Sequence, residues 1–354
     1  MVVNLGEPVV LVSSAEFVLK SSHVRRTLEQ RLIDDIRLAL RKSNIYDFTI
    51  GKVAGRIVVG GISEAESAAR VIARIFGVAY AIPAIKVEGS TDSVLSAIRQ
   101  TAMDSLGVGQ TFAVRCHRSA LNPVSTRDVE KEGGSQILDA LAERKVRVNL
   151  TEPDVLISVD FSAKEAYLFT TRIPGSGGLP LSSEWKMLAI MDSPLALLAA
   201  YVMMRRGCLT QLLIPCSGVD IRFNAERQIA QATKLRDFVT RERYSGYILD
   251  LDALPHAASL IRRIGVEFAS QRRFRGVVFA DAKGPIGSIS FLTQRSRDLG
   301  IPIFQPLIGF GETEVIELAQ LLSVEWRESS DAPVEIESKE NLDSLSLPIK
   351  EVSL

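Results

Sequence analysis

The chain has few of the residues that would place it in a specialised class of protein. It contains only 3 cysteines among 354 residues, at positions 116, 208 and 216. They form no CxxC pair typical of zinc sites and are too scattered for a disulfide framework, which fits a reducing compartment. A signal-peptide core and an apolar run of membrane-spanning length are also missing, and we therefore expect a cytoplasmic protein.

An excess of one charge sign is missing too. Lys and Arg together number 42, as do Asp and Glu, so the formal net charge is +0. From Glu325 onward eight acidic residues face three basic ones, which leaves the preceding residues with five positive charges in excess. An excess this small does not by itself indicate a nucleic-acid-binding protein. Aromatic residues make up only 6% of the chain, which disfavours recognition of bases on an aromatic stacking platform.

Glycine is absent from a turn where α/β proteins commonly use it. The stretch "KMLAIMDSPLALLAAYVMMRRG" at 186–207 predicts a buried strand, a turn and a helix that ends at Gly207. The N-terminus of such a helix is a common phosphate site, because its free backbone N–H groups attract anions. Here the turn has no glycine, and Asp192 or Ser193 is expected to cap the helix, with Pro194 in its first turn.

The order of apolar segments predicts an α/β fold with several domains. Residues 1–80 read strand, helix, strand, helix, strand, which favours a small ferredoxin-like sheet. Residues 81–175 form a second α/β unit, which ends near the connector "PGSGGLPLSSE". Residues 176–326 alternate apolar strands with helices and predict a doubly wound parallel sheet. Residues 327–354 are acidic, and we expect them to form a mobile tail.

Several stretches resemble one family in the same order along the chain. "SSAEFVLKSSHVRRTLE", "AGRIVV" and "RIFGVAYAIPA" match the family's N-terminal domain, and "FAVRCHRSALNPVSTRDVEKEGGSQIL" and "EPDVLISVDFSAKEAYLFTTRIPGSGGLP" match its second domain. "YVMMRRG" and "GVVFADAKGPIGS" match the catalytic domain. The chain resembles the tRNA 4-thiouridine synthetases (ThiI), in the short form without a rhodanese domain. The resemblance implies a ferredoxin-like domain, a THUMP RNA-binding domain and a PP-loop ATP pyrophosphatase-like domain.

The resemblance implies tRNA as a partner, ATP and Mg²⁺ as cofactors, and a sulfur-donor protein and a homodimer as further partners. Isolated basic side chains are usually solvated surface, but some of them stand where the family positions RNA. These predicted RNA-binding residues are Lys20, Arg25, Arg26, Arg115, His117, Arg118 and Arg127.

The PP-loop of the family, SGGxDS, is degenerate here. The matching stretch is "LAIMDSP", which keeps an Asp-Ser pair and loses both glycines. Gln305 stands where an Arg is usual, and Ile261 stands where the family has a catalytic cysteine. A second stretch, "PCSGVD" at 215–220, looks like SGGxD but follows the next strand. The predicted cofactor-binding residues are Met191, Asp192, Ser193, Asp281, Gly284 and Ser288.

Asp192 and Cys216 are the candidate catalytic residues. Asp192 is either a helix cap or a remnant that coordinates Mg²⁺ or phosphate. Cys216 ends a parallel strand, at the edge where doubly wound sheets bind ligands, and is either core filler or a sulfur carrier. Cys116 and Cys208 are predicted to be structural.

These features support two hypotheses. The first is a tRNA-binding protein whose third domain has lost ATP-dependent catalysis. The second is an active tRNA sulfurtransferase, in which ATP adenylates the C4 oxygen of a uridine and a persulfide displaces AMP. The glycine-free turn, Gln305 and Ile261 favour the first hypothesis.

Overall fold

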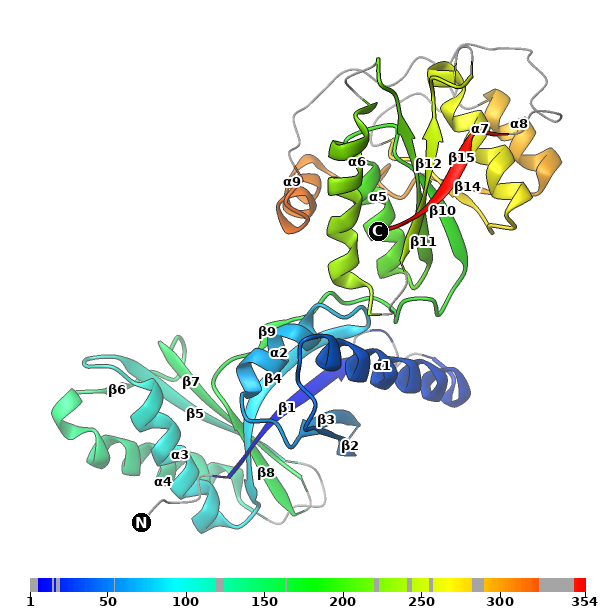
Figure 1. The fold of residues 1–354 in the computed structure, drawn as a ribbon. Coiled ribbons are helices and arrows are strands. Elements are labelled where there is room, and N and C mark those ends of the chain that lie inside the picture. The colour runs from blue at the N-terminus through cyan, green and yellow to red at the C-terminus, as the bar shows by residue number, and fades with distance from the viewer. Residues whose placement is uncertain are drawn as a thin grey trace. The chain divides into compact units, whose positions relative to one another are not determined.

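The computed structural model describes most of the chain, in two compact units (Figure 1). The first unit contains residues 1–21 and 32–177, and the second contains residues 22–31 and 178–354. Within the described part, no helix combines the length and the apolarity needed to cross a lipid bilayer. The described residues are 6–14, 16, 20–53, 55–118, 124–162, 164–219, 223–240, 244–254, 257–281, 290–324 and 347–354.

One mixed sheet runs through the first unit. Its described strands follow the order β2-β3-β1-β4-β8-β7-β5-β6, with β9 paired to β4. The strands are β1 (Glu7–Ser14), β2 (Thr49–Val53), β3 (Arg56–Gly60), β4 (Val78–Glu88), β5 (Thr111–Arg118), β6 (Arg147–Val148), β7 (Val155–Phe161), β8 (Glu165–Phe169) and β9 (Ile173–Pro174). The helices are α2 (Ala65–Ala73), α3 (Thr91–Ser105) and α4 (Thr126–Ala140), followed by a 3-10 turn at Ala142–Arg144. Helix α1 (Ser22–Lys42) belongs to the first unit only from residue 32 onward.

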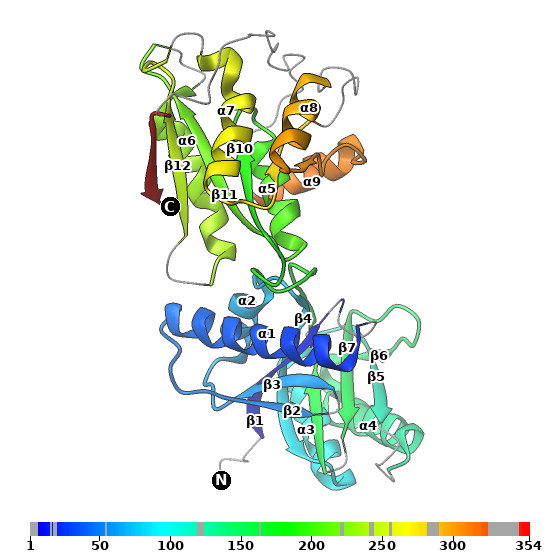
Figure 2. The same cartoon turned by 90° about the vertical axis from the view of Figure 1, so that its right-hand side faces the viewer.

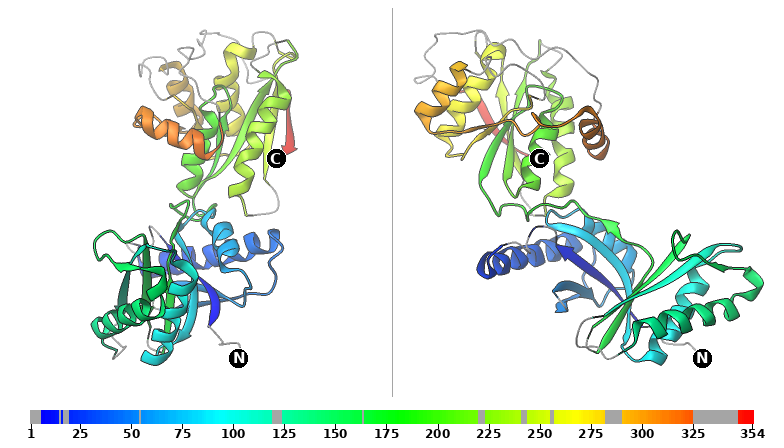
Figure 3. Two further views of the ribbon diagram at one scale, coloured as in Figure 1. Left: turned by 90° about the vertical axis from the view of Figure 1, so that its left-hand side faces the viewer. Right: turned by 180° about the vertical axis from the view of Figure 1, so that it is seen from behind.

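Strand β4 joins the two halves of this sheet. It has 11 residues, of which those between Val78 and Lys86 pair antiparallel with β1, and its last four residues pair antiparallel with β8. Figure 3 shows β1 beside β4 in the ferredoxin-like half. The sequence pattern missed β2, whose residues "TIGKV" are mostly exposed at the sheet edge and therefore lack an apolar run.

Both faces of the first sheet are buried in part. Alternate residues of a strand point to opposite faces, and on β1 Val9 and Leu11 join one apolar cluster while Val10 is buried on the other side. An apolar cluster beside α3 and α4 includes Ile98, Phe112 and Ile137. The first unit therefore has the mixed α/β architecture that the resemblance implies.

The second unit is a doubly wound sheet with the order β14-β13-β10-β11-β12-β15. Helices α7 and α8 cover one face, and α5, α6 and α9 lie on the other (Figure 2). The strands are β10 (Lys186–Ile190), β11 (Leu209–Cys216), β12 (Ser245–Asp250), β13 (Val277–Val278), β14 (Ile303–Phe304) and β15 (Ile349–Ser353). The helices are α5 (Ala196–Arg205), α6 (Ala225–Ala232), α7 (Ala257–Gln271), α8 (Ser290–Leu299) and α9 (Glu312–Leu321), with a 3-10 helix at Thr233–Phe238.

Strand β15 differs from the mobile tail that the sequence predicts. Residues 349–353 pair antiparallel with β12, and Leu354 is only 2% exposed. Leu347 and Ile349 pack against the core between the sheet and α7. The acidic composition of the tail concealed this short apolar segment, and residues 325–346 lie outside the described residues.

Gly178 is required where the chain enters the second unit. Its φ is +71°, and a Cβ atom at this position would lie 1.9 Å from the carbonyl oxygen of Arg205 at the end of α5. Only glycine combines that backbone conformation with so close an approach. The "GGLP" segment is therefore held against the C-terminal end of α5. The turn from β10 into the N-terminal end of the same helix forms part of the candidate site.

Candidate functional site

The carboxyl edge of the second sheet gathers polar side chains from three neighbouring strands. Asp192 follows β10, Asp281 follows β13 and Gln305 follows β14. β10 pairs in parallel with β11 on one side and with β13 on the other, so the strand order reverses at β10. Doubly wound sheets bind ligands at such a reversal, outside the carboxyl ends of the strands. This edge is therefore the first candidate site.

Arg262 of α7 links these side chains to one another. Its Nε atom donates to Asp192 Oδ2 at 2.6 Å, and its terminal nitrogens donate to the Asp281 carboxylate at 2.7 and 3.1 Å. Gln305 Nε2 also donates to Asp281, at 2.7 Å. The ring of Phe279 lies under the guanidinium, with 4.8 Å between its centroid and Cζ. One cation is thus shared by two carboxylates from different strands.

The cluster is buried, and burial determines how its groups ionise. The side chains of Arg262 and Asp192 are 9% and 1% exposed. Burial raises the pKa of Asp192, and the attraction of Arg262 opposes that shift. Burial also disfavours the charge on Arg262, but Asp192 and Asp281 outweigh this effect and raise the pKa of the guanidinium. Arg262 therefore keeps its positive charge.

The prediction that Asp192 or Ser193 caps the helix is wrong. Helix α5 begins at Ala196, its N-cap is Leu195, and no side chain makes a capping hydrogen bond. The Asp192 carboxylate instead turns to Arg262, an ion pair between distant segments that local sequence cannot reveal. Asp192 Oδ1 and Ser193 Oγ are buried without a hydrogen-bond partner among the described residues.

The other predicted cofactor-binding residues do not all lie at this edge of the sheet. Met191 is 1% exposed, and its backbone N–H donates to Leu213 at 2.9 Å, so its side chain belongs to the core. Asp281 lies at the sheet edge beside Arg262. Gly284 and Ser288 lie outside the described residues.

Cys216 lies at the same edge but in an unreactive environment. It is 8% exposed, its Sγ donates to the carbonyl of Ile214 at 3.7 Å, and burial together with Asp250 raises its pKa. A sulfur carrier needs a thiol with a lowered pKa, so these surroundings disfavour that role. Ile261 is 3% exposed in the core under α7.

The "PCSGVD" stretch binds a carboxylate of the same chain, that of Asp252. Asp252 accepts hydrogen bonds from the Ser217 hydroxyl at 2.6 Å and from the Gly218 N–H at 2.7 Å. The Ser217 bond contributes most to lowering the pKa of Asp252. The backbone that resembles a phosphate loop is therefore occupied by this carboxylate, and position 220 lies outside the described residues.

A groove in the first unit brings together two of the predicted RNA-binding residues. It has a volume of about 290 Å³ and lies where the two halves of the first sheet meet. Arg56 of β3 pairs with Asp160 of β7, and His117 Nδ1 lies 3.7 Å from the second oxygen of Asp160. The residues lining the groove are Leu11, Val53, Arg56, Val58, His117, Arg118, Asp160, Phe161, Ser162 and Tyr167.

Arg115 and Arg127 lie outside the groove lining. Arg115 donates to the carbonyl of Leu150 at 2.7 Å, which holds the loop before β7, and Arg127 is exposed in the first turn of α4. Arg25 and Arg26 are exposed in the first turns of α1, where Arg25 lies 3.9 Å from Glu29, and Lys20 is exposed before α1.

Sequence reasoning missed Arg56 and Asp160 as site residues. Arg56 belongs to "AGRIVV" and Asp160 to "LISVDFS", two stretches that carry the family resemblance. Their pairing joins strands that are distant in sequence, so only the fold reveals that they share a groove. The basic residue in "AGRIVV" was the one available signal.

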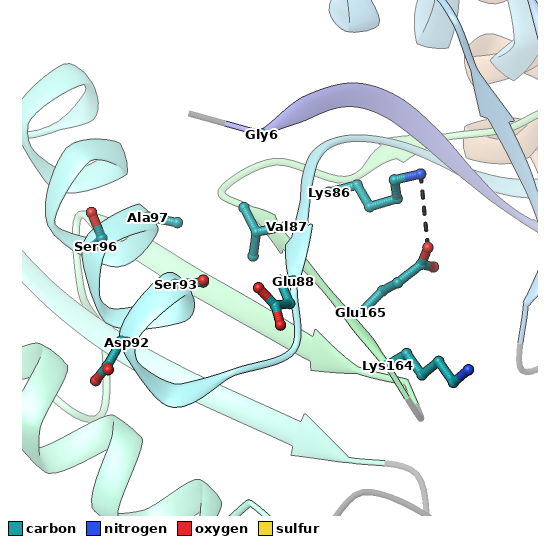
Figure 4. A pocket seen from close by; sticks show the side chains of 10 residues that line it. All are labelled: Gly6, Lys86, Val87, Glu88, Asp92, Ser93, Ser96, Ala97, Lys164 and Glu165. Atoms are coloured by element: carbon teal, nitrogen blue, oxygen red, sulfur yellow. Dashed lines mark ion pairs between the residues drawn. The ribbon is translucent and has the colours of Figure 1, made fainter. Parts of the chain in front are cut away.

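A wider hollow beside α3 has mixed charge (Figure 4). Its volume is about 780 Å³. Lys86 pairs there with Glu7 at 2.6 Å and with Glu165 at 3.8 Å. Glu88 and Asp92 add negative charge to the lining, so this hollow is less suited to a phosphate backbone than the groove that contains Arg56.

Comparison with known proteins places two domains in the first unit. Residues 9–81 match the ThiI ferredoxin-like domain, and residues 90–171 match the THUMP domain. A "probable tRNA sulfurtransferase" of Methanosarcina acetivorans is 28% identical over 345 residues, which cover 89% of this chain and 81% of that protein. A tRNA sulfurtransferase of Thermoplasma acidophilum is 27% identical over 341 residues, covering 88% of this chain and 66% of that protein.

The chain is similar to tRNA sulfurtransferases along most of its length. A 4-thiouridine synthetase solved in complex with RNA and with bound ATP has the same fold, with a TM-score of 0.74 and 20% identity, over 90% of this chain and 85% of that one. A protein of Pyrococcus horikoshii matches with a TM-score of 0.67 and 24% identity, over 89% of this chain and 99% of that one.

The two domain matches contribute opposite sides of the groove. The ferredoxin-like match contains Arg56, whereas the THUMP match contains His117, Arg118 and Asp160. The cluster around Arg262 lies beyond both matches. The groove therefore lies within the matched domains, and the cluster around Arg262 lies outside them.

Proposed function

We propose that this chain is a tRNA-binding protein that has kept the RNA-binding half of a ThiI protein and has lost its ATP-dependent catalysis. The observation that carries the first part is the groove, in which Arg56, His117 and Arg118 line a hollow between the ferredoxin-like and THUMP halves. Cationic side chains around a hollow bind the phosphate backbone of RNA and release its counterions.

The chemistry of the groove favours RNA shape and backbone over stacked bases. The aromatic residues of its lining, Phe161 and Tyr167, are both buried, and the Tyr167 hydroxyl is already bonded to Glu165 at 2.6 Å. Folded RNA is recognised mainly through phosphate and 2′-hydroxyl contacts. Asp160 pairs with Arg56 and so fixes the position of its guanidinium in the groove. The same carboxylate competes with an RNA phosphate for that guanidinium.

The loss of ATP chemistry is supported by the edge around Arg262. A pyrophosphate needs several backbone N–H groups that converge from a glycine-rich turn, and "LAIMDSP" has no glycine. Asp192 is 1% exposed and is held by Arg262, so its carboxylate is not available to a hydrated cation. The residues here do not fit a bound ATP–Mg²⁺ complex.

The second candidate is an active tRNA sulfurtransferase. The relatives named tRNA sulfurtransferases match along most of the chain, and a 4-thiouridine synthetase of the same fold was solved with bound ATP. This candidate requires a reactive thiol, and burial raises the pKa of Cys216. A sulfur-donor protein, a homodimer and a cytoplasmic location stay predictions.

Two titrations of the full chain test the proposal. Affinity for folded tRNA should fall steeply as salt rises, with a log–log slope of roughly −0.7 to −0.9 for each phosphate contact. Binding that ignores salt, or that prefers a random single strand, would contradict RNA recognition by the groove.

Calorimetric titration with ATP–Mg²⁺ tests the loss of catalysis. We expect a dissociation constant in the millimolar range or no detectable heat, since two or three missing charge-assisted hydrogen bonds weaken binding roughly a thousandfold or more. A micromolar constant that is lost on Asp192→Ala would favour the sulfurtransferase instead.

A further inference from the structure

Four exposed basic side chains gather at the amino edge of the second sheet, at the opposite end of the strands from the Arg262 cluster. Lys186 is the first residue of β10, and Arg275 lies two residues before β13. The N–H of Arg275 donates to the carbonyl of Lys186 at 2.9 Å, so these two residues are neighbours. Arg272 and Arg273 directly follow α7. We call these four side chains the amino-edge cations.

Two of the amino-edge cations lie against buried aromatic rings. Lys186 Nζ is 4.6 Å from the centroid of Phe274, and Arg272 Cζ is 5.6 Å from that of Phe268. The two rings belong to the same apolar cluster, with 6.5 Å between their centroids. Because the face of an aromatic ring attracts a cation, these rings hold both charges in place at the surface of the unit.

No carboxylate of the described residues makes an ion pair with the amino-edge cations. Burial lowers the pKa of Lys186 most, Glu351 of β15 opposes that shift, and Arg272 adds to it. Lys186 and Arg272 are therefore close enough to repel each other. Glu184 lies on the other side of β10, where its N–H donates to the carbonyl of Gly207. Four positive charges thus have one carboxylate near them, and this edge attracts anions.

The end of α7 carries an arginine at a position that favours glycine. Arg273 has a φ of +57°, and its N–H donates to the carbonyl of Ser270 while that of Phe274 donates to Ala269. This hydrogen-bond pattern ends many helices, usually with glycine in the left-handed position. The Arg273 side chain is exposed and adds nothing to the core. A role at the surface accounts for the arginine, whereas folding favours glycine.

We propose that the amino-edge cations are a second contact for the phosphate backbone of tRNA. The inference rests on the proposed function and adds a contact surface in the second unit, whereas the groove belongs to the first. Unpaired cations in fixed positions bind phosphates and release their counterions without reading sequence. Three of the four are arginines, whose guanidinium matches the geometry of phosphate oxygens. The groove has a volume of about 290 Å³, so most phosphates of a folded tRNA stay outside it.

The double variant Arg272→Gln with Arg275→Gln tests the inference in the full chain. It removes two charges and leaves the buried rings of Phe268 and Phe274 unchanged. The log–log slope of tRNA affinity against salt should become shallower by about 1.4 to 1.8, since each lost phosphate contact removes roughly 0.7 to 0.9. At low salt the affinity should fall on the order of 10-fold. Fluorescence anisotropy with labelled tRNA measures both quantities.

The matched control removes the same charge elsewhere on the second unit. Arg227→Gln with Arg297→Gln changes exposed arginines of α6 and α8 and should leave the salt slope unchanged. Photocrosslinking locates the contact without removing any cation. The photoreactive amino acid p-benzoylphenylalanine in place of Gln271, which is exposed at the end of α7, should crosslink to tRNA. The same amino acid in place of Arg297 should not.

The results separate this inference from the proposed function. An unchanged salt slope in the Arg272→Gln, Arg275→Gln variant, or an equal loss in the control, would overturn the inference, as would the absence of a crosslink from position 271. If Arg56→Gln in the groove weakens tRNA binding in the same experiments, the proposed function stands and only the second contact is wrong. A wild type that binds no tRNA would refute both.

Discussion

Arg56 and Arg262 each pair with aspartate, but their exposure gives them different capabilities. The Arg56 side chain is 38% exposed while it pairs with Asp160, so water screens the pair and the guanidinium can exchange a carboxylate for a phosphate at little cost. Arg262 is 9% exposed, and separation from its partners would leave buried charges uncompensated. Arg56 is therefore suited to bind a ligand, whereas Arg262 is held by its two carboxylates.

Asp160→Asn should raise the affinity for tRNA. The change removes a negative charge from the groove and frees Arg56 and His117 for phosphate, and we expect an increase of about 3- to 10-fold at low salt. Fluorescence anisotropy with labelled tRNA measures it. Asp104→Asn on α3, an exposed carboxylate bonded to Gln100, is the control and should change affinity little. Unchanged or weaker binding by Asp160→Asn would argue against RNA in this groove.

The cysteines should be unreactive while the chain is folded. Burial raises the pKa of Cys116 from 9.0 to about 12, with Glu130 and Asp160 adding to the shift. At pH 8 its thiolate fraction is therefore roughly a thousandfold lower than in the unfolded chain. Iodoacetamide labelling with and without urea measures this difference. The pKa of Cys216 is also raised by burial. Rapid labelling of native Cys216 would therefore favour the alternative that it carries sulfur.

The same shift predicts how stability depends on pH. The fold favours the protonated thiol of Cys116, so this contribution is complete below pH 9.0 and is lost as pH rises toward about 12. Cys116→Ala should remove that part of the alkaline decline in stability.

At the scale of helices and strands, the regular apolar segments were predictable and the edges were not. Strand β10 is apolar from Met187 to Ile190 and β11 from Leu212 to Cys216, and the sequence pattern identifies such runs directly. Strands β2 and β15 are short edge strands with exposed polar residues, so their sequences carry little signal. The start of α5 was misplaced because Asp192, which resembles a cap, is bonded to Arg262, 70 residues away. Side-chain pairs between distant segments are decided by the fold.

Gly178→Ala should destabilise the second unit strongly. Its φ of +71° and the 1.9 Å approach of a Cβ atom to the Arg205 carbonyl make alanine strained and crowded, and we expect a loss of about 2 kcal/mol or more. Gly134→Ala is the control, because Gly134 lies in α4 with nothing within 4 Å of a new Cβ. It should stabilise the protein by about 0.5–1 kcal/mol. Denaturant unfolding followed by circular dichroism compares the two, and equal effects would show that Gly178 is not tightly packed against Arg205.

At the scale of the whole molecule, each unit has its own apolar core. One lies between the first sheet and α3 and α4, and the other lies between the second sheet and α7. We expect two transitions in differential scanning calorimetry. Gly178→Ala should lower one transition and Asp160→Asn the other. A single transition that both variants shift equally would show that the units unfold as one.

Because β4 pairs with both β1 and β8, the two sides of the groove belong to one continuous sheet. The ferredoxin-like and THUMP halves therefore cannot move apart by a hinge motion when RNA binds. In stopped-flow mixing, the observed association rate should rise in proportion to tRNA concentration and show no plateau, since no conformational step precedes capture. A rate that saturates would mean that this strand bends or breaks before the RNA is held.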